Sequence, residues 1–500
     1  MSDRLQYCSL FSSYTAELIS FNLDIKEIVN NKTKKGKMKT TRFKDILLGV
    51  EQLLLTIRIK SFSDNDISKK VRDMLSEVLR DFPWIIRFTD WTGSTYSVGG
   101  NISHWSGREP MNIHMKTREA GHDLLAFSGM RFMERFLDGE VDITGNLYLL
   151  SEIRNYAKFN LKPLQIIQNR IRNLIFQTPA KARESVKSHY DIPEDALSYL
   201  DRVYRSYSCG IFERPHDLNL TDVLTVGEGE SDKLDTLEKA QWRKFAHAAD
   251  FLAPNENETI LDVGCGYPGF LMVLMDRYPV KKVVGWTHSA NQVTEGKAML
   301  KGYDPERYEL NEGDYREDKQ VYDHIHSTGM ISHVGPPGHD SGLVNYVREV
   351  RGRIKTHGRY VHHALMTSYR RTPLFDRLGP AFNRRYVWPG FYWYTLGEHV
   401  KALEENGFQV NKIYNLSHHY AKTTRAWYER IMEKKETFIE HAGEHTFRAW
   451  QIFLAGITGS YLNRQIHCYR IFCEATDIEK PSIHVSDPTH NVAPYQTIDL

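Results

Sequence analysis

The stretch LDVGCGYPGF, residues 261–270, decides the fold of the larger part of this chain. It opens as an apolar strand, and Gly264, Gly266 and Gly269 then form a G-x-G-x-x-G turn that leads into an apolar helical sequence. Glycines in such a turn allow a tight bend and let backbone N–H groups approach a ligand closely. Dinucleotide-binding proteins share this spacing, so the motif predicts a strand–turn–helix unit with a cofactor and leaves the identity of the cofactor open.

Predicted strands and helices alternate around this motif. The predicted strands are TILDVG (259–264), KKVVGWT (281–287), YDHIHSTGM (322–330) and GRYVHHALM (358–366), and the first predicted helices are GFLMVLMDRY (269–278) and ANQVTEGKAML (290–300). This alternation predicts an α/β domain with a parallel, doubly wound, Rossmann-like sheet. Residues 425–460 interrupt the pattern and are predicted to form a helical insert.

The ends of the next two predicted strands separate the candidate cofactors. A nicotinamide site needs an acidic residue about 20 positions after the glycine turn to hold the ribose, but no acid follows Trp286 until Glu295. The polar residues there are uncharged, namely Thr287, Ser289, Asn291 and Gln292. A further strand end carries Asp314 and Tyr315, an acid and an aromatic suited to adenine. Together these strand ends favour S-adenosylmethionine over NAD.

Composition bounds the remaining possibilities. The chain has 500 residues, is 41% hydrophobic and 26% charged, and carries a formal net charge of +2. This length predicts two or three domains. The cysteines show neither zinc-ligand nor disulfide spacing, so we expect no metal and a reducing, cytoplasmic location; they are Cys8, Cys209, Cys265, Cys468 and Cys473. No basic stripe accompanies the motifs, which argues against a nucleic-acid partner.

Five segments are expected along the chain. They are a helical and basic extension (1–80), a small α+β domain (81–165), a helical linker (166–188), the domain that holds the glycine motif (189–478) and a disordered tail (479–500). A run of Lys and Arg without acids, from Asn31 to Lys44, either binds anionic head groups or is a solvated segment. The longest uncharged stretch, Gln451 to Asn463, is much shorter than the roughly 20 residues of a spanning helix. Membrane contact is therefore expected to be peripheral.

Several ordered motifs resemble the cyclopropane fatty acid synthase family, which includes mycolic acid methyltransferases. YSCGIF (207–212) resembles the family's YSCAYF/W, LDVGCGYPG resembles LDIGCGWGG, and GMISHVGP (329–336) resembles GMFEHVGP. HYDIPEDALSYL (189–200) resembles the start of the family's catalytic domain, and AWYER (426–430) is unchanged from it. The likeness covers roughly residues 185–475. FLDGEVDITG, before it, more loosely resembles a small lipid-carrier-like domain. The resemblance implies a class I methyltransferase fold.

The resemblance also implies a reaction and a site. The implied reaction adds a methylene group from S-adenosylmethionine across the double bond of an unsaturated phospholipid acyl chain, at a membrane surface and in an enzyme that relatives suggest is a homodimer. Cofactor contacts are implied for Tyr207, Ser208, Gly264, Cys265, Gly266, Gly269, Thr287, Ser289, Asn291, Gln292, Asp314 and Tyr315. A bicarbonate ion that acts as general base is implied next to Cys209, Ser332, His363, Leu365 (through its backbone) and Tyr420.

The chemistry explains these residue types. An alkene is a poor nucleophile, so methyl transfer leaves a carbocation-like centre that aromatic rings can stabilise by about 2 kcal/mol in a dry site. The transferred methyl must then lose a proton to close the ring, which requires a base beside an apolar, water-free pocket. The aromatic stretch YVWPGFYWYTL (386–396) is expected to line a tunnel for the acyl chain or to form ordinary packing.

Two positions depart from the family pattern. Pro268 removes a backbone donor from the glycine loop, which is expected to modify the affinity for the cofactor. Ser332 stands where the family has glutamate, and three outcomes stay open. Cyclopropanation is kept through a water or His333; the ion binds differently and gives a methyl-branched or methylene product; or the ion is absent and His363 is the base. A lipid-binding protein without catalysis is the remaining alternative.

Overall fold

A computed structural model describes residues 63–100, 110–126, 128–157, 199–215, 235–338, 341–368, 378–388 and 391–477. Residues 68–500 form one compact unit, and nearly all of the described residues belong to it. The predictions for residues 1–62, for the linker (166–188), for most of HYDIPEDALSYL and for the tail (479–500) lie outside the described residues. The five predicted domain boundaries therefore stay predictions.

The first described part is a small α+β domain, as expected. Its elements are α3 (Asp64–Val78), β1 (Ile85–Thr89), β2 (Thr95–Gly99), β3 (Met111–Met115), α4 (Arg118–Leu125), α5 (Gly129–Leu137), β4 (Val141–Gly145), η1 (Leu147–Leu149) and α6 (Leu150–Tyr156). The strands form one sheet in the order β2-β1-β3-β4, in which β1 and β3 run parallel and the other pairs antiparallel. The expected likeness to a lipid-carrier domain stays a prediction.

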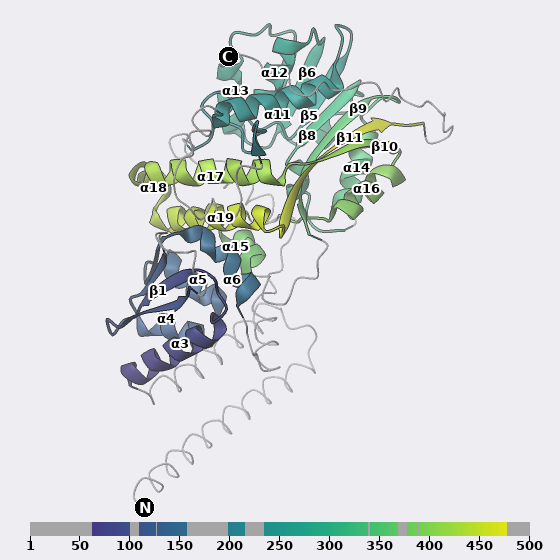
Figure 1. The fold of residues 1–500 in the computed structure, drawn as a ribbon. Coiled ribbons are helices and arrows are strands. Elements are labelled where there is room, and N and C mark those ends of the chain that lie inside the picture. The colour runs from purple at the N-terminus through teal and green to yellow at the C-terminus, as the bar shows by residue number, and fades with distance from the viewer. Residues whose placement is uncertain are drawn as a thin grey trace, which may run out of the picture. The chain divides into compact units, whose positions relative to one another are not determined.

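The second described part is a seven-stranded sheet with helices on both faces (Figure 1). Its strands are β5 (Thr259–Val263), β6 (Lys282–Thr287), β7 (Tyr308–Glu312), β8 (His324–Thr328), β9 (Arg359–Thr367), β10 (Phe408–Asn415) and β11 (Ile466–Ala475). Its helices are α11 (Leu237–Leu252), α12 (Gly269–Arg277), α13 (Ala290–Met299), α14 (Leu343–Arg351), α15 (Leu378–Tyr386) and α16 (Leu396–Glu405), with short turns η4 (Tyr315–Glu317) and η5 (Met330–His333). The predicted strands and helices around the glycine motif are confirmed.

The sheet order is β10-β11-β9-β8-β5-β6-β7, and one strand corrects the expected all-parallel sheet. Strand β11 runs antiparallel to both β9 and β10. Between β10 and β11 the chain forms α17 (Ser417–Glu433), α18 (Lys435–Ala442) and α19 (Glu444–Leu462). Helices α17 and α19 lie side by side (Figure 1). The insert leaves the sheet at the end of β10 and returns to the same edge of the sheet. The next strand must therefore run backwards, and the helical insert begins at Ser417 rather than at residue 425.

Side-chain alternation along the strands builds a separate core on each face of this sheet. Ile260, Val361 and Phe472 point to the face covered by α11 and α12 and share a core with Phe270. Leu261, Tyr360 and Ile471, one position along, join the core under α14 and α16. Residues whose positions differ by two share a face, so the register decides which polar side chains can meet. Among the described residues, no helix combines the length and apolar character needed to cross a membrane.

Candidate active site

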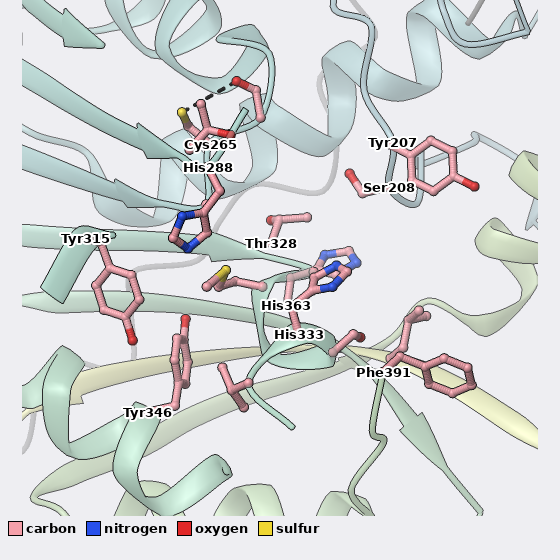
Figure 2. A pocket seen from close by; sticks show the side chains of 18 of the residues that line it. Tyr207, Ser208, Cys265, His288, Tyr315, Thr328, His333, Tyr346, His363 and Phe391 are labelled. Atoms are coloured by element: carbon pink, nitrogen blue, oxygen red, sulfur yellow. Dashed lines mark hydrogen bonds between the residues drawn. The ribbon is translucent and has the colours of Figure 1, made fainter. Parts of the chain in front are cut away.

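A cavity of about 1020 Å³ lies at the carboxyl ends of the parallel strands (Figure 2). In open α/β sheets, ligands bind at the carboxyl ends of the strands. The site lies at the strand from which the chain connections lead in opposite directions along the sheet. The reversal occurs here at β5, between β6 and β8. Ligand pockets for one small molecule typically measure roughly 300–1,000 Å³. This cavity is therefore large enough for a cofactor and part of a second ligand.

The glycine loop forms one wall of the cavity. Gly264 and Gly266 have φ angles of +72° and +58°, a conformation that favours glycine. A Cβ on Gly264 would lie 2.9 Å from Sδ of Met330, so the loop has no room for a side chain there. Gly269 serves another purpose, because its Cβ would lie 2.7 Å from the ring of Phe245. Two glycines thus shape the ligand wall, and the third lets α12 pack closely.

The turn after β6 is preorganised by its own hydrogen bonds. Thr287 Oγ1 donates to Oε1 of Gln292 at 2.6 Å, and Ser289 caps α13 by accepting from the backbone N–H of Gln292 at 3.3 Å. All three side chains are buried and line the cavity. Such uncharged groups suit the hydroxyls of a ribose and fit S-adenosylmethionine.

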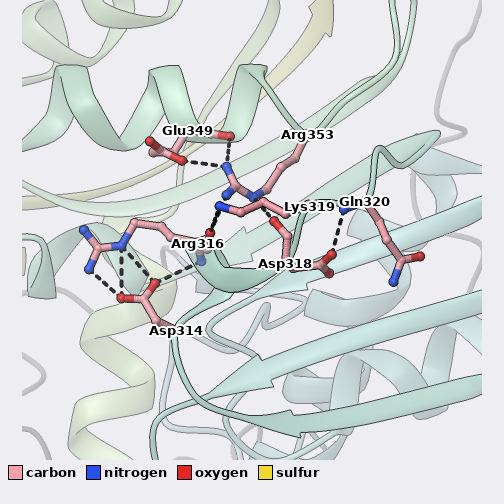
Figure 3. Close-up of polar contacts among 7 residues, drawn as sticks. All are labelled: Asp314, Arg316, Asp318, Lys319, Gln320, Glu349 and Arg353. Atoms are coloured by element: carbon pink, nitrogen blue, oxygen red, sulfur yellow. Dashed lines mark hydrogen bonds and ion pairs between the residues drawn. The ribbon is translucent and has the colours of Figure 1, made fainter.

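The strand end after β7 brings an acid and an aromatic ring to the same wall. Arg316 donates to both carboxylate oxygens of Asp314 (Figure 3). Burial raises the pKa of Asp314, but these hydrogen bonds outweigh burial and hold that pKa below its usual range. Arg353 donates to the backbone carbonyl oxygens of Arg316 and Asp318 at 2.8 and 3.0 Å, which fixes the turn. Tyr315 is buried beside this turn.

The opposite end of the cavity is aromatic. Tyr207 stacks on Trp427 with ring centroids 4.8 Å apart, and Trp388 lies 5.0 Å from the same tyrosine ring. Phe391 and Phe453 extend this wall. The predicted aromatic stretch thus lines the cavity with several of its members, and the end next to the helical insert is suited to an apolar chain.

Between these two ends, strand register places a row of polar side chains on the face under α11. Asp262 pairs with His326 across β5 and β8, Thr328 pairs with His363 across β8 and β9, and His363 pairs with Arg470 across β9 and β11. Paired residues point to the same face. We call Asp262, His326 and Thr328 the acidic end of this row, and His363 and Arg470 the basic end.

At the acidic end, hydrogen bonds fix the tautomer of His326. The Asp262 Oδ1 lies 2.7 Å from Nδ1 of His326, and Thr328 Oγ1 lies 3.0 Å from Nε2. A carboxylate accepts, so Nδ1 carries the proton and Nε2 accepts from the Thr328 hydroxyl. Burial lowers the pKa of His326, and Asp262 opposes that change. The ring of Phe270 stacks on this imidazole at 3.8 Å.

At the basic end, Arg470 imposes the opposite tautomer on His363. The guanidinium donates to Nδ1 of His363 from Nε at 3.3 Å and from Nη2 at 3.2 Å. Arginine can only donate, so the His363 proton lies on Nε2, which is 3.1 Å from Sγ of Cys468. Burial and the charges of Arg470 and Lys244 lower the pKa of His363 well below its ordinary value. Both ring nitrogens of His363 are thus engaged, Nδ1 by Arg470 and Nε2 by Cys468, which argues against the alternative that His363 replaces the ion as base.

Most predicted site residues meet in this cavity. The residues among them that line it are Tyr207, Ser208, Gly264, Cys265, Gly266, Thr287, Ser289, Gln292, Asp314, Tyr315, Ser332, His363, Leu365 and Tyr420. Cys209, Gly269 and Asn291 are not part of the lining. Cys209 is buried directly behind it, where Sγ lies 3.7 Å from the Leu416 carbonyl oxygen. Ser332 is 6% exposed, and its hydroxyl meets no hydrogen-bond partner among the described residues.

Three buried residues resemble a metal-ligand set. The Sγ atoms of Cys209 and Cys468 and a ring nitrogen of His363 lie within 4.8 Å of one another. Metal binding requires thiolates, but burial raises the pKa of Cys468 well above its ordinary value. The positive charges of Arg470 and Lys244 next to this group also oppose a dication. The chemistry of this cluster favours an anion nearby, and no metal is assigned to it.

Sequence reasoning named His363 but missed the other members of the polar row. His326, Ser327 and Thr328 follow one another in YDHIHSTGM, and polar residues on a buried strand were the signal available. Lys244, fully buried in α11, donates from Nζ to Ser208 Oγ at 2.8 Å. Arg470 is also fully buried, and it lies in a largely apolar strand whose sequence did not mark it as a site residue.

Comparisons with known proteins agree with this geometry. The family model for mycolic acid cyclopropane synthetase matches residues 177–471. The cyclopropane-fatty-acyl-phospholipid synthase of Escherichia coli K12 is 25% identical over 73% of this chain and 88% of that protein. The sphingolipid C9-methyltransferase 1 of Gibberella zeae is 26% identical over 68% of this chain, which spans 64% of that longer relative. The structure of the cyclopropane synthase MmaA2 from Mycobacterium tuberculosis superposes with a TM-score of 0.51 at 23% identity, covering 58% of this chain and 98% of that one.

Proposed function

This chain belongs to the mycolic acid cyclopropane synthetase family and is an S-adenosylmethionine-dependent methyltransferase of lipid acyl chains, and on that premise we propose that it adds a methylene group across the double bond of an unsaturated phospholipid acyl chain. The observation that carries the proposal is the single cavity that joins the cofactor wall to an aromatic end. The cofactor, when bound, supplies an electrophilic methyl group.

The aromatic end supports an apolar acceptor. Trp388, Phe391, Trp427 and Phe453 line it, and such rings both accommodate an acyl chain and stabilise a carbocation by about 2 kcal/mol when water is excluded. A small polar acceptor would instead require charged groups at this end. We place the double bond between these rings and the polar row, where the cavity changes from aromatic to polar.

The basic end of the row supports a bound anion. His363, Ser332 and Tyr420 all line the cavity, and the buried Ser332 hydroxyl meets no hydrogen-bond partner among the described residues. Arg470 adds a buried positive charge that donates to His363, whereas burial lowers the pKa of Lys244 to about 7. These groups fit bicarbonate, which would supply a base of its own when bound.

The proposed acceptor lies in a membrane, so the proposal includes peripheral contact with a phospholipid surface. The basic run from Asn31 to Lys44 is the segment with the charge for anionic head groups. A homodimer remains part of the proposal on the family likeness alone.

A second candidate is a C-methyltransferase that leaves a methyl branch instead of a ring. Two observations favour it: a sphingolipid C9-methyltransferase is among the relatives, and Ser332 replaces the family glutamate. The two candidates differ only in which proton leaves the substrate after methyl transfer.

The purified protein, labelled S-adenosylmethionine and vesicles of monounsaturated phospholipid test this proposal. Acyl products are identified by mass spectrometry after derivatisation that distinguishes a ring from a branch. A cyclopropane product supports the first candidate. A methyl-branched product moves the assignment to the second, and cofactor binding without any methylated lipid contradicts both.

A further inference from the structure

Lys244, in α11, is fully buried and lies behind the cavity wall rather than in it. From Nζ it donates to the hydroxyl oxygens of Ser206 and Ser208, the latter at 2.8 Å. Among the described residues both of these partners are neutral, and no carboxylate forms an ion pair with the ammonium. A buried charge without a counter-ion is costly. The ammonium is therefore expected to serve an anion that the cavity binds.

The hydrogen bonds around this lysine leave one serine hydrogen for a ligand. An ammonium can only donate, so both serine oxygens accept from Lys244. The oxygens of Ser206 and Ser208 are 3.0 Å apart, and one hydroxyl donates to the other. The second hydroxyl hydrogen then has no acceptor among the described residues. Ser208 is the more exposed of the two serines and lines the pocket (Figure 2), so this hydrogen is available to a ligand there.

The backbone around Ser208 is fixed without the lysine. Asp201 accepts from the backbone N–H of Ser206 at 2.7 Å. Gln241 donates to the backbone carbonyl oxygen of Ser208 at 2.8 Å. Lys244 therefore orients hydroxyl hydrogens and supplies charge, and the shape of the loop does not depend on it.

The order of the strands places the amino acid part of S-adenosylmethionine next to these serines. The acid and the aromatic ring suited to adenine follow β7, the polar turn suited to the ribose follows β6, and β5 with its glycine loop comes next in the sheet. Arg205 lies over the ring of Tyr267 in that loop, so residues 205–208 border the same end of the cavity. A cofactor that spans these strand ends in order brings its carboxylate to Ser208. Pro268 leaves the loop one N–H donor short, which makes a hydroxyl donor more important here.

We propose that Lys244 is a positioning residue for S-adenosylmethionine, whose ammonium turns the Ser208 hydroxyl toward the carboxylate of the cofactor. The lysine touches neither the cofactor nor the lipid and acts through Ser208. The inference depends on the cofactor of this family and not on the proposed lipid acceptor, so the lipid assay and the binding measurements can fail independently.

The lysine also gives cofactor binding a pH dependence. Burial lowers the pKa of Lys244 to about 7, the carboxylates of Asp201 and Asp262 oppose this change, and Arg470 adds to it. A neutral amine accepts from a serine hydroxyl and draws that hydrogen away from the cavity. A bound carboxylate favours the ammonium and raises this pKa, so the cofactor should bind more tightly below pH 7 than above it.

Other titratable groups lie near this lysine, on β8, β9, β11 and the segment that carries the serines. They are His326, His363, Cys468 and Cys209. Burial lowers the pKa of both histidines and raises that of the Cys468 thiol, so these three stay neutral between pH 6.5 and pH 8.5. The pKa of Lys244 lies inside this window.

Calorimetric titration of the full-length protein with two ligands tests the proposal. S-adenosylhomocysteine carries the carboxylate, whereas 5′-methylthioadenosine keeps the adenine, ribose and thioether without the amino acid part. At pH 6.5, Lys244→Met should raise the Kd of the first ligand at least about tenfold and that of the second by less than about twofold. Lys239→Met makes the same change in the same helix, outside the cavity lining, and is the matched control that should alter neither Kd.

Two further measurements separate positioning from packing. Between pH 6.5 and pH 8.5 the Kd of S-adenosylhomocysteine should rise at least about fivefold more in the wild type than in Lys244→Met, which has no amine to titrate. Ser208→Ala should weaken this ligand as Lys244→Met does. The double variant should show little further loss, because the lysine acts through that hydroxyl.

Three results would overturn the inference. They are equal weakening of both ligands in Lys244→Met, the same pH dependence in that variant and the wild type, or fully additive losses in the double variant. If Lys244→Met does not fold, Ser208→Ala decides alone. It should lose most of the pH dependence of binding, and a full wild-type dependence in Ser208→Ala would contradict the proposal.

Discussion

The two ends of the polar row differ in what stands behind each histidine. Asp262 stands behind His326 and turns the far nitrogen into an acceptor, whereas Arg470 stands behind His363 and turns the far nitrogen into a donor. Both rings are buried, and both lie on the same face of the same sheet. The difference shows that the partner of a buried histidine, rather than its burial, decides its chemical role.

Removing Arg470 should have the largest effect on stability. Arg470→Leu leaves Nδ1 of His363, Nδ1 of His247 and the Lys244 carbonyl without their buried donor. We expect unfolding in urea to lose at least about 3 kcal/mol. Arg470→Lys keeps the charge and should lose less. A loss below about 1 kcal/mol in Arg470→Leu would mean that the basic end does not depend on this guanidinium.

Replacing Asp262 should remove the acceptor at the other end. In Asp262→Asn the amide can donate to Nδ1, so the His326 proton moves to Nε2 and Thr328 loses its acceptor. The low-field imidazole N–H signal expected from the bond between His326 and Asp262 should vanish from the proton NMR spectrum. The dissociation constant of S-adenosylhomocysteine, measured by calorimetry, is the control because Asp262 also lines the cavity. An unchanged low-field signal in Asp262→Asn would contradict the tautomer assignment.

Lowering the pH should destabilise the fold. Protonation of His363, at the basic end of the row, should contribute more to this loss than protonation of His326, at the acidic end. The folded state holds His363 neutral with a lowered pKa, while the unfolded chain protonates near pH 6.5, so stability is present above that pH and falls as the pH drops. This loss should appear as the pH falls below about 6.5, where the unfolded histidine takes up its proton. His326 should contribute less because Asp262 opposes the effect of burial.

Thermal unfolding between pH 7 and pH 5 checks this difference. His363→Gln should flatten the pH dependence more than His326→Gln does. Equal slopes in the two variants would show that Asp262 gives His326 no protection. His362 and His399, whose pKa values burial also lowers, remain in both variants and provide the common background.

Ser332→Ala should have the smallest effect. The Ser332 hydroxyl is buried without a partner among the described residues, so its removal should leave the free energy of unfolding unchanged or raise it by up to about 1 kcal/mol. A loss of stability above about 1 kcal/mol would mean that this hydroxyl makes a hydrogen bond that holds the fold.

Local signals in the sequence predicted the sheet and the cofactor wall. The glycine turn at Gly264 and Gly266 and the polar turn at Thr287 each depend on residues a few positions apart, and the structure places both at the cavity. The antiparallel β11 could not be predicted, because its direction follows from where the helical insert returns the chain.

The contacts within the polar row could not be predicted from the sequence either. Asp262 and His326 are 64 positions apart, and His363 and Arg470 are 107 apart, so their contacts exist only through strand register. Family likeness drew attention to His363 and to Ser332, which stands where the family has glutamate. It gave no reason to examine Thr328, which bonds His326 two positions away in the same strand.

The most direct test of the account supplies S-adenosylmethionine with three deuterons on its methyl group to the wild-type protein and monounsaturated phospholipid vesicles. The account predicts a ring that retains two of the three deuterons, since the third leaves from the transferred methyl. A lipid that keeps all three deuterons on a methyl branch would contradict it, because the proton would then have left from the acyl chain.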